Sequence, residues 1–287
     1  MRRLVIFDFD GTMTDAEREG VPFRAGYLED LAVLTGRPLQ EIVALAGAFE
    51  AEIAADSGRY GWMFEGRIVA PASVDPYLRI MPVARRILDH FGCMTSETDR
   101  SRLLDGILYK YNYQKTVVAF RPGALELLLA LHDQPDTALY VVTNSHTEPV
   151  QQKIARLGAR ADGSNALEWL LEGVHGRARK YIIDDTFDAV PPSVSVPGLE
   201  RPILLRRRHY AEAIEALRAR HGLAWDRVWV VGDIFELDLA LPLTLGANGM
   251  LVTNAHTPAY EVAYLSGHPR GRVVPSLEAA RELLVSP

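Results

Sequence analysis

Two aspartates, Asp8 and Asp10, stand two positions apart directly after a short apolar run at residues 4–7. Residues two apart on a straight strand share a face, so the two carboxylates would lie side by side. Carboxylates this close repel each other unless a cation or a proton holds them. The pair therefore predicts a metal site or a proton-transfer site, and Gly11 marks a turn directly after it.

Polar residues also end two later apolar runs. Thr143 and Asn144 follow the run at 138–142, and Asp233 follows the run at 228–231 after a glycine. A hydroxyl and backbone N–H groups at the start of a helix suit a phosphate oxygen, and a further carboxylate suits a cation. We expect these residues to meet at one edge of a sheet.

The elements that would position these residues alternate between strand and helix patterns. Strands are predicted at residues 4–7, 138–142, 181–183, 202–205, 228–231, 250–252 and 272–274. Helices are predicted at residues 124–132, 149–157, 210–221 and 277–284. This alternation predicts an α/β fold, a Rossmann-like parallel sheet with helices on its faces and ligands at the carboxyl ends of its strands.

The segment between the first and second strands has a different pattern. Helical spacing of apolar residues recurs at 23–34, 38–53, 82–91 and 96–113, and we predict no strand there. The sequence therefore predicts two domains. The core comprises residues 1–15 and 118–287, and an all-helical domain at 16–117 is inserted into it.

Composition narrows the function further. The 287 residues carry a formal net charge of −6, which argues against a nucleic-acid-binding surface. Cys93 is the single cysteine, so an intrachain disulfide or a cysteine-based metal site cannot form. The apolar run at 4–7 is too short for a signal peptide, and we find no membrane-spanning stretch. We expect a cytoplasmic protein that binds neither nucleic acid nor membrane. The sequence does not decide between a monomer and a homodimer.

The motifs together resemble those of the haloacid dehalogenase-like (HAD) superfamily. Asp8-Phe9-Asp10-Gly11-Thr12 resembles its first motif, D-x-D-G-T, and Thr143-Asn144 resembles its second. The segment from Gly232 to Asp238 matches its fourth motif, G-D-x-x-x-x-D. The resemblance implies an α/β core with an inserted helical cap domain.

The resemblance also implies a mechanism. Asp8 would attack phosphorus to form an aspartyl-phosphate, and Asp10 would act as general acid and base. Mg²⁺ would be held by a carboxylate oxygen of Asp8, the backbone carbonyl of Asp10, and Asp233. Dehalogenases of the family attack carbon and lack a proton donor at the position of Asp10. The sequence therefore favours phosphoryl chemistry and the phosphatase branch.

Further roles follow from the same resemblance. Thr143, Asn144 and Gly11 would bind the phosphoryl group. Asp238 would orient the basic residue or a metal-bound water, and Glu236 is a weaker candidate participant.

The third motif, a single Lys or Arg, is harder to place. Arg207 is the favoured candidate, because Arg206, Arg207 and Arg208 stand at a predicted strand end before the helix that leads to Asp233. Lys180 is the alternative, 37 positions after Thr143 (180 − 143). If residues 181–183 form a parallel strand, Lys180 lies at its amino end, away from the site.

The inserted domain would contact the substrate and select it. Its aromatic stretch from Tyr60 to Phe64, with Arg67, supplies the candidate substrate contacts. The expected substrate is a small-molecule phosphate monoester, because a cap hinders access by a protein. Two other functions stay open: a phosphotransferase or mutase, and a non-catalytic protein that binds a phosphate ligand.

Overall fold

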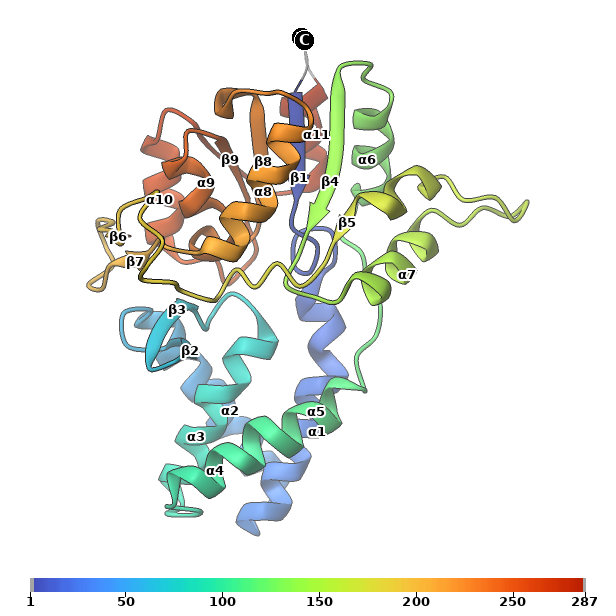
Figure 1. Cartoon of the computed structure of the whole chain (residues 1–287). Coiled ribbons are helices and arrows are strands. Elements are labelled where there is room, and N and C mark those ends of the chain that lie inside the picture. The colour runs from blue at the N-terminus through green and yellow to red at the C-terminus, as the bar shows by residue number, and fades with distance from the viewer. Residues whose placement is uncertain (1–2, 286–287) are drawn as a thin grey trace. The chain divides into compact units, whose positions relative to one another are not determined.

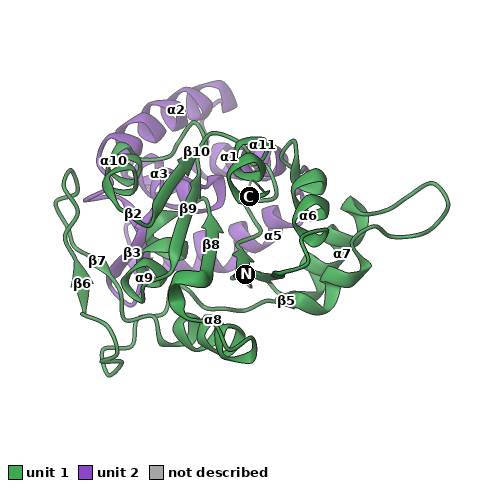
Figure 2. Ribbon diagram, turned by 90° about the horizontal axis from the view of Figure 1, so that it is seen from above, with its two compact units in different colours: residues 1–15, 120–287 green, residues 16–119 purple. Residues whose placement is uncertain are grey.

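The computed structural model describes residues 3–285, so residues 1–2 and 286–287 of the expected core lie outside the described part of the chain. The chain divides into two compact units (Figure 2). Unit 1 comprises residues 1–15 and 120–287, and unit 2 comprises residues 16–119.

Unit 1 is built on a six-stranded sheet with the strand order β10-β9-β8-β1-β4-β5. Figure 1 labels β9, β8, β1, β4 and β5 of this sheet. Every pairing in this sheet is parallel. The strands are β1 (Arg3–Phe7), β4 (Thr137–Val142), β5 (Val174–His175), β8 (Val228–Gly232), β9 (Asn248–Val252) and β10 (Gly271–Val274). The predicted Rossmann-like α/β fold is confirmed.

Helices cover both faces of the sheet. They are α6 (Ala124–His132), α7 (Thr147–Leu157), α8 (Arg208–Arg220), α9 (Ala240–Thr244), α10 (Ala259–Gly267) and α11 (Leu277–Val285). Shorter helical turns are η2 (Glu168–Gly173), η3 (Trp225–Arg227) and η4 (Phe235–Leu239). Alternate residues of β1 belong to different cores: Leu4 and Ile6 cluster with α8, α9 and α10, whereas Val5 and Phe7 cluster with α6, α7 and α11. All four side chains are fully buried, as expected for a central parallel strand.

One strand prediction in unit 1 is wrong, and another is confirmed as a strand that lies outside the main sheet. Residues 181–183 form no strand, and they follow a turn at Lys180. Residues 203–204 form β7 (Ile203–Leu204), which pairs antiparallel with β6 (Ser193–Val194) in a separate hairpin rather than joining the main sheet. The sixth strand of the main sheet is β5, which at two residues is too short to give a periodic signal.

Unit 2 is mostly helical. Its helices are α1 (Ala16–Thr35), α2 (Leu39–Ala55), α3 (Pro76–His90), α4 (Glu97–Leu103), η1 (Leu104–Leu108) and α5 (Tyr109–Tyr113). The prediction of an all-helical domain is wrong in one place, because β2 (Gly61–Phe64) and β3 (Arg67–Pro71) form an antiparallel hairpin. Glu65 and Gly66, both with positive φ, make the two-residue turn that a hairpin needs. No helix within residues 3–285 is long and apolar enough to cross a membrane.

Candidate active site

The carboxyl ends of the three central strands bring the predicted polar residues together. Phe7 of β1 lies opposite Val141 of β4 and Val231 of β8 in the register of the sheet. The residues that follow these strands therefore gather at one edge, as the parallel arrangement requires. Asp8, Thr143 and Asp233 are all buried there.

Asp8 is enclosed by protein groups. Its Oδ1 accepts a hydrogen bond from Nζ of Lys180 at 2.7 Å, and its Oδ2 accepts one from Oγ1 of Thr12 at 3.2 Å. Burial raises the pKa of Asp8 to about 7, with Lys180 opposing the rise and Asp238 adding to it. Asp8 is thus a desolvated carboxylate with a cation against it, which suits a nucleophile.

Lys180, rather than Arg207, is the basic residue at Asp8. Its Nζ bonds Asp8 at 2.7 Å and Asp238 at 2.8 Å, and the residue is 1% exposed. Burial alone would lower the pKa of Lys180, but Asp238 and Asp8 outweigh it and raise the pKa. The preference for Arg207 rested on the arginine run at a predicted strand end, and Lys180 was placed away from the site on the assumption that residues 181–183 form a strand. Because β5 precedes Lys180 instead, Lys180 lies beyond the carboxyl end of a strand.

The three consecutive arginines have other partners. Arg207 is fully buried and donates to the backbone carbonyls of Leu204 and Lys180. Arg206 donates to the carbonyl of Asp185, and Arg208 pairs with the carboxylate of Asp184.

Asp10 has a more open environment than Asp8. Its Oδ2 accepts from Oγ of Ser145 at 2.6 Å, and its Oδ1 pairs with Nζ of Lys153 at 2.9 Å. Its side chain is 28% exposed, so it can exchange protons with water. A carboxylate held in place beside the nucleophile and open to solvent suits general acid and base catalysis.

A group of three buried acids at this edge could hold a metal ion. Oxygens of Asp8, Asp233 and Asp238 lie within 4.8 Å of one another. The hydroxyl of Thr12 bonds both Asp8 and Asp233, the latter at 3.1 Å, and so ties the two carboxylates together. An all-oxygen, carboxylate-rich donor set fits a hard divalent cation.

Gly11 is required at its position. Its φ is +85°, a conformation that side chains disfavour. A Cβ on Gly11 would also lie 2.2 Å from Oδ2 of Asp233. The glycine therefore lets the loop after β1 approach the acids closely.

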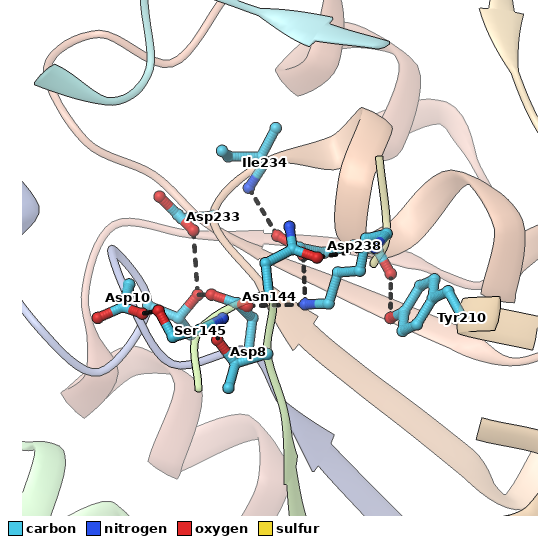
Figure 3. Close-up of polar contacts among 11 residues, drawn as sticks. Asp8, Asp10, Asn144, Ser145, Tyr210, Asp233, Ile234 and Asp238 are labelled. Atoms are coloured by element: carbon cyan, nitrogen blue, oxygen red, sulfur yellow. Dashed lines mark hydrogen bonds and ion pairs between the residues drawn. The ribbon is translucent and has the colours of Figure 1, made fainter. Parts of the chain in front are cut away.

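The second-motif residues support the site through backbone contacts. Oγ1 of Thr143 accepts from the backbone N–H of Ser145 at 3.2 Å. Oδ1 of Asn144 accepts from the backbone N–H of Lys180 at 2.7 Å, and so fixes the lysine (Figure 3).

The fourth-motif loop is also tightly held. Oδ2 of Asp238 accepts from the backbone N–H of Ile234 at 3.1 Å, and its carbonyl accepts from the hydroxyl of Tyr210 at 2.8 Å. Asp238 therefore orients Lys180 from a rigid position. Glu236 is buried and paired with Arg201 at 2.7 Å, so it serves this loop rather than Asp8.

Three residues of the site were not among the predicted ones: Thr12, Ser145 and Lys153. Thr12 belongs to the first motif and Ser145 follows the second, so both carried a usable signal. No sequence signal marked Lys153, because only the packing of α7 beside Asp10 brings this lysine to the site.

In unit 2, part of the predicted aromatic stretch borders a cavity of about 450 Å³. Gly61, Trp62 and Met63 contribute to its lining. The other lining residues are Tyr77, Leu78, Met81, Pro82, Arg85, Asp105 and Tyr109. Tyr60 instead donates its hydroxyl to Glu52.

The parallel sheet defines a Rossmann-like α/β protein, and acids gather at the carboxyl edge of that sheet. Comparisons with known proteins identify the family to which this protein belongs. The family model of haloacid dehalogenase-like hydrolases matches residues 2–241, and a model described as HAD-hydrolase-like matches residues 206–280. The chain therefore belongs to the HAD-like hydrolases, which confirms the resemblance read from its motifs. A search among curated proteins found no match.

Two of the following solved structures, those with TM-scores above 0.5, share the fold. A predicted phosphoglycolate phosphatase from Haemophilus somnus is 14% identical, with a TM-score of 0.56 and 98% of this chain and 97% of that chain covered. A magnesium-bound protein from Bacillus subtilis, described as a HAD-hydrolase, is 15% identical, with a TM-score of 0.51 and 99% of each chain covered. A 2-haloacid dehalogenase from Pseudomonas syringae is 19% identical, with a TM-score of 0.41 and 99% of this chain and 98% of that chain covered.

Proposed function

We propose that this HAD-like hydrolase is a Mg²⁺-dependent phosphatase that cleaves small-molecule phosphate monoesters. The observation that carries the proposal is the second carboxylate, Asp10, held by Ser145 and Lys153 while it keeps contact with solvent. Attack on phosphorus needs a group that protonates the leaving oxygen and then activates water. Attack on a carbon–halogen bond needs no such donor, because halide leaves without a proton.

The proposed reaction has two steps. A carboxylate oxygen of Asp8 attacks phosphorus, the bond to the leaving oxygen breaks, and Asp10 gives that oxygen a proton. Asp10 then takes a proton from water, whose oxygen attacks the same phosphorus and releases inorganic phosphate and Asp8. Lys180, 2.7 Å from Asp8, offsets the combined negative charge of the nucleophile and the phosphoryl group.

The same edge would hold the metal ion. Carboxylate oxygens of Asp8 and Asp233 and the backbone carbonyl of Asp10 are the proposed ligands. Thr12 supports this assignment, because its hydroxyl bonds both carboxylates. Mg²⁺ would supply positive charge against the phosphoryl oxygens. We assign Asp238 to Lys180 and to the fourth-motif loop, from whose Ile234 N–H it accepts a hydrogen bond, rather than to the metal ion.

Unit 2 is proposed to act as a cap that selects the substrate. It is inserted between the first and second motifs. Its cavity of about 450 Å³, bordered by Trp62 and Met63, has the size of a small-molecule site.

The test is a screen of phosphate monoesters with purified protein, in Mg²⁺ and in EDTA. We expect hydrolysis that requires the metal and that falls about 10⁴-fold or more in Asp8→Asn, because the nucleophile is lost. Wild-type rates in Asp8→Asn would exclude the aspartyl-phosphate. Transfer of phosphate to an added alcohol in preference to water would favour a phosphotransferase. Tight phosphate-ester binding without turnover would favour a binding protein.

A further inference from the structure

Lys180 reaches two carboxylates although it lies outside any helix or strand. It sits at a turn in the irregular segment that links β5 to β6. Two residues just before it, Arg177 and Arg179, have positive φ values of 55° and 49°. Non-glycine residues seldom adopt this conformation, so the surrounding structure has to maintain it. A lysine side chain is also long and flexible, so its many rotamers have to be restricted. Something other than regular structure must therefore fix Lys180.

Residues 185–205 form an excursion that leaves this segment and returns to it. The backbone N–H of Asp184 donates to the carbonyl of Arg206 at 2.8 Å, which closes the excursion at its base. Arg208 pairs with Asp184 across the same base, and Arg206 donates to the carbonyl of Asp185. The backbone hydrogen bond between Asp184 and Arg206, which needs no arginine side chain, brings residue 207 next to Lys180.

Arg207 fills the space between the closed base and Lys180. It is fully buried, and its guanidinium donates to the carbonyl oxygens of Lys180 and Leu204. Burial lowers the pKa of Arg207 to about 10, with Glu236 and Asp238 opposing the change. Burying a guanidinium is costly unless its environment compensates, so this position is not one that a generic surface arginine would occupy.

The peptide groups of Lys180 are therefore held on both sides. Asn144 accepts from its N–H at 2.7 Å, and Arg207 donates to its carbonyl. We propose that Arg207 is a positioning residue that fixes the backbone of Lys180 so that its Nζ reaches both Asp8 and Asp238. The kinetic part of this proposal depends on the phosphatase function; the geometric part does not.

The flanking arginines provide matched controls. Arg206 and Arg208 are each one residue from Arg207, and their bonds to Asp185 and Asp184 lie at the partly exposed base of the excursion. If any arginine in this run would serve, Arg206→Met and Arg208→Met should act as Arg207→Met does. If the clamp is specific, only Arg207→Met should release Lys180.

The first measurement is chemical labelling of lysine with trinitrobenzenesulfonate, read by peptide mass spectrometry. The chain's lysines are Lys110, Lys115, Lys153 and Lys180, and the exposed Lys110 serves as an internal reference. We expect Arg207→Met to raise labelling of Lys180 relative to Lys110 about tenfold or more, because the lysine is released locally. The two control variants should keep the wild-type ratio. A wild-type ratio in a folded Arg207→Met protein would overturn the proposal.

Methionine keeps much of the apolar volume of arginine and removes a buried charge, so we expect this variant to fold. Arg207→Lys, which keeps the charge but offers no planar fork, is the second variant. If Arg207→Met unfolds, Arg207→Lys decides: partial release of Lys180 supports the clamp, and complete protection contradicts it.

The second measurement uses the reaction. In Arg207→Ala, kcat should fall about 10–100-fold, and added methylguanidine should restore part of it by filling the space left by the side chain. Lys180→Met, which lacks the group being positioned, should gain nothing from methylguanidine.

If the wild type cleaves no phosphate ester, the proposed function fails while labelling still decides the clamp. Loss of kcat in Arg207→Ala without rescue, combined with unchanged labelling, would reject the clamp alone.

Discussion

The two carboxylates of the first motif differ in their surroundings although one residue separates them. The side chain of Asp8 is 11% exposed, and both of its oxygens accept hydrogen bonds from buried groups, Lys180 and Thr12. The side chain of Asp10 is 28% exposed, and its cationic partner, Lys153, is 23% exposed. The site thus has a deep half around Asp8 and an outer half around Asp10.

In the proposed reaction, this difference separates two chemical tasks. A nucleophile is most effective when it is desolvated and held still, which the deep half provides. A proton carrier needs to exchange protons with water, which the outer half allows. The lysines follow the same division. The ion pairs of Lys180 are buried and resist screening, whereas the pair between Lys153 and Asp10 is partly screened by solvent.

The largest expected effect on stability comes from Lys180→Met, in the deep half. Its removal leaves Asp8 and Asp238 buried without their cation, so the free energy of unfolding should fall by about 3–5 kcal/mol in metal-free buffer. Phosphatase activity should fall about 10³-fold, because the positive charge against the phosphoryl group is lost. Urea unfolding and steady-state kinetics measure the two effects. A loss of stability below about 1 kcal/mol would mean that the deep half resembles a surface pair.

Asp10→Asn tests the outer half and should act on the reaction without a comparable loss of stability. Asparagine cannot donate or accept the catalytic proton, so hydrolysis of an alkyl phosphate should fall about 10²–10⁴-fold. p-Nitrophenyl phosphate should lose less, because its leaving group departs with little need of a proton. The ratio of the two kcat/KM losses is the measurement. Equal losses for both substrates would indicate that Asp10 supports the site without transferring protons.

Much of the core could be predicted from the sequence because its strands are apolar runs that end in polar residues. This pattern located β1, β4 and β8 and hence Asp8, Thr143 and Asp233. It failed for β5, because two residues carry no periodicity, and for residues 181–183, because an apolar triplet needs a neighbouring strand to become one. That error counted against Lys180 and, together with the arginine run at the end of the predicted strand at 202–205, favoured Arg207.

The rest of the site depends on packing that a linear pattern does not record. Lys153 is one polar residue among several on α7, and only the docking of that helix brings it to Asp10. The sequence also did not indicate that Arg207 is buried between two half-buried arginines, because an arginine run normally indicates a solvated surface. The hairpin in unit 2 was missed because its turn uses Glu65-Gly66 rather than a common turn pair such as Asn-Gly.

The smallest expected effect comes from Lys153→Met, which removes the cation of the outer half. Because this ion pair is partly exposed, its loss should change the free energy of unfolding by about 1 kcal/mol or less. The hydroxyl of Ser145 still holds the other oxygen of Asp10 at 2.6 Å, so the carboxylate keeps part of its orientation. We therefore expect hydrolysis of an alkyl phosphate to fall about tenfold, with a smaller loss for p-nitrophenyl phosphate.

Gln152→Met is the matched control, since Gln152 precedes Lys153 on α7 and is exposed. It should leave both substrates unchanged. A loss in Lys153→Met as large as that in Lys180→Met, or one that is independent of the leaving group, would erase the distinction between the two halves. Lys153 would then act on the phosphoryl group itself. The predicted pattern, a modest loss that grows as the leaving group becomes poorer, follows only if Lys153 acts through Asp10.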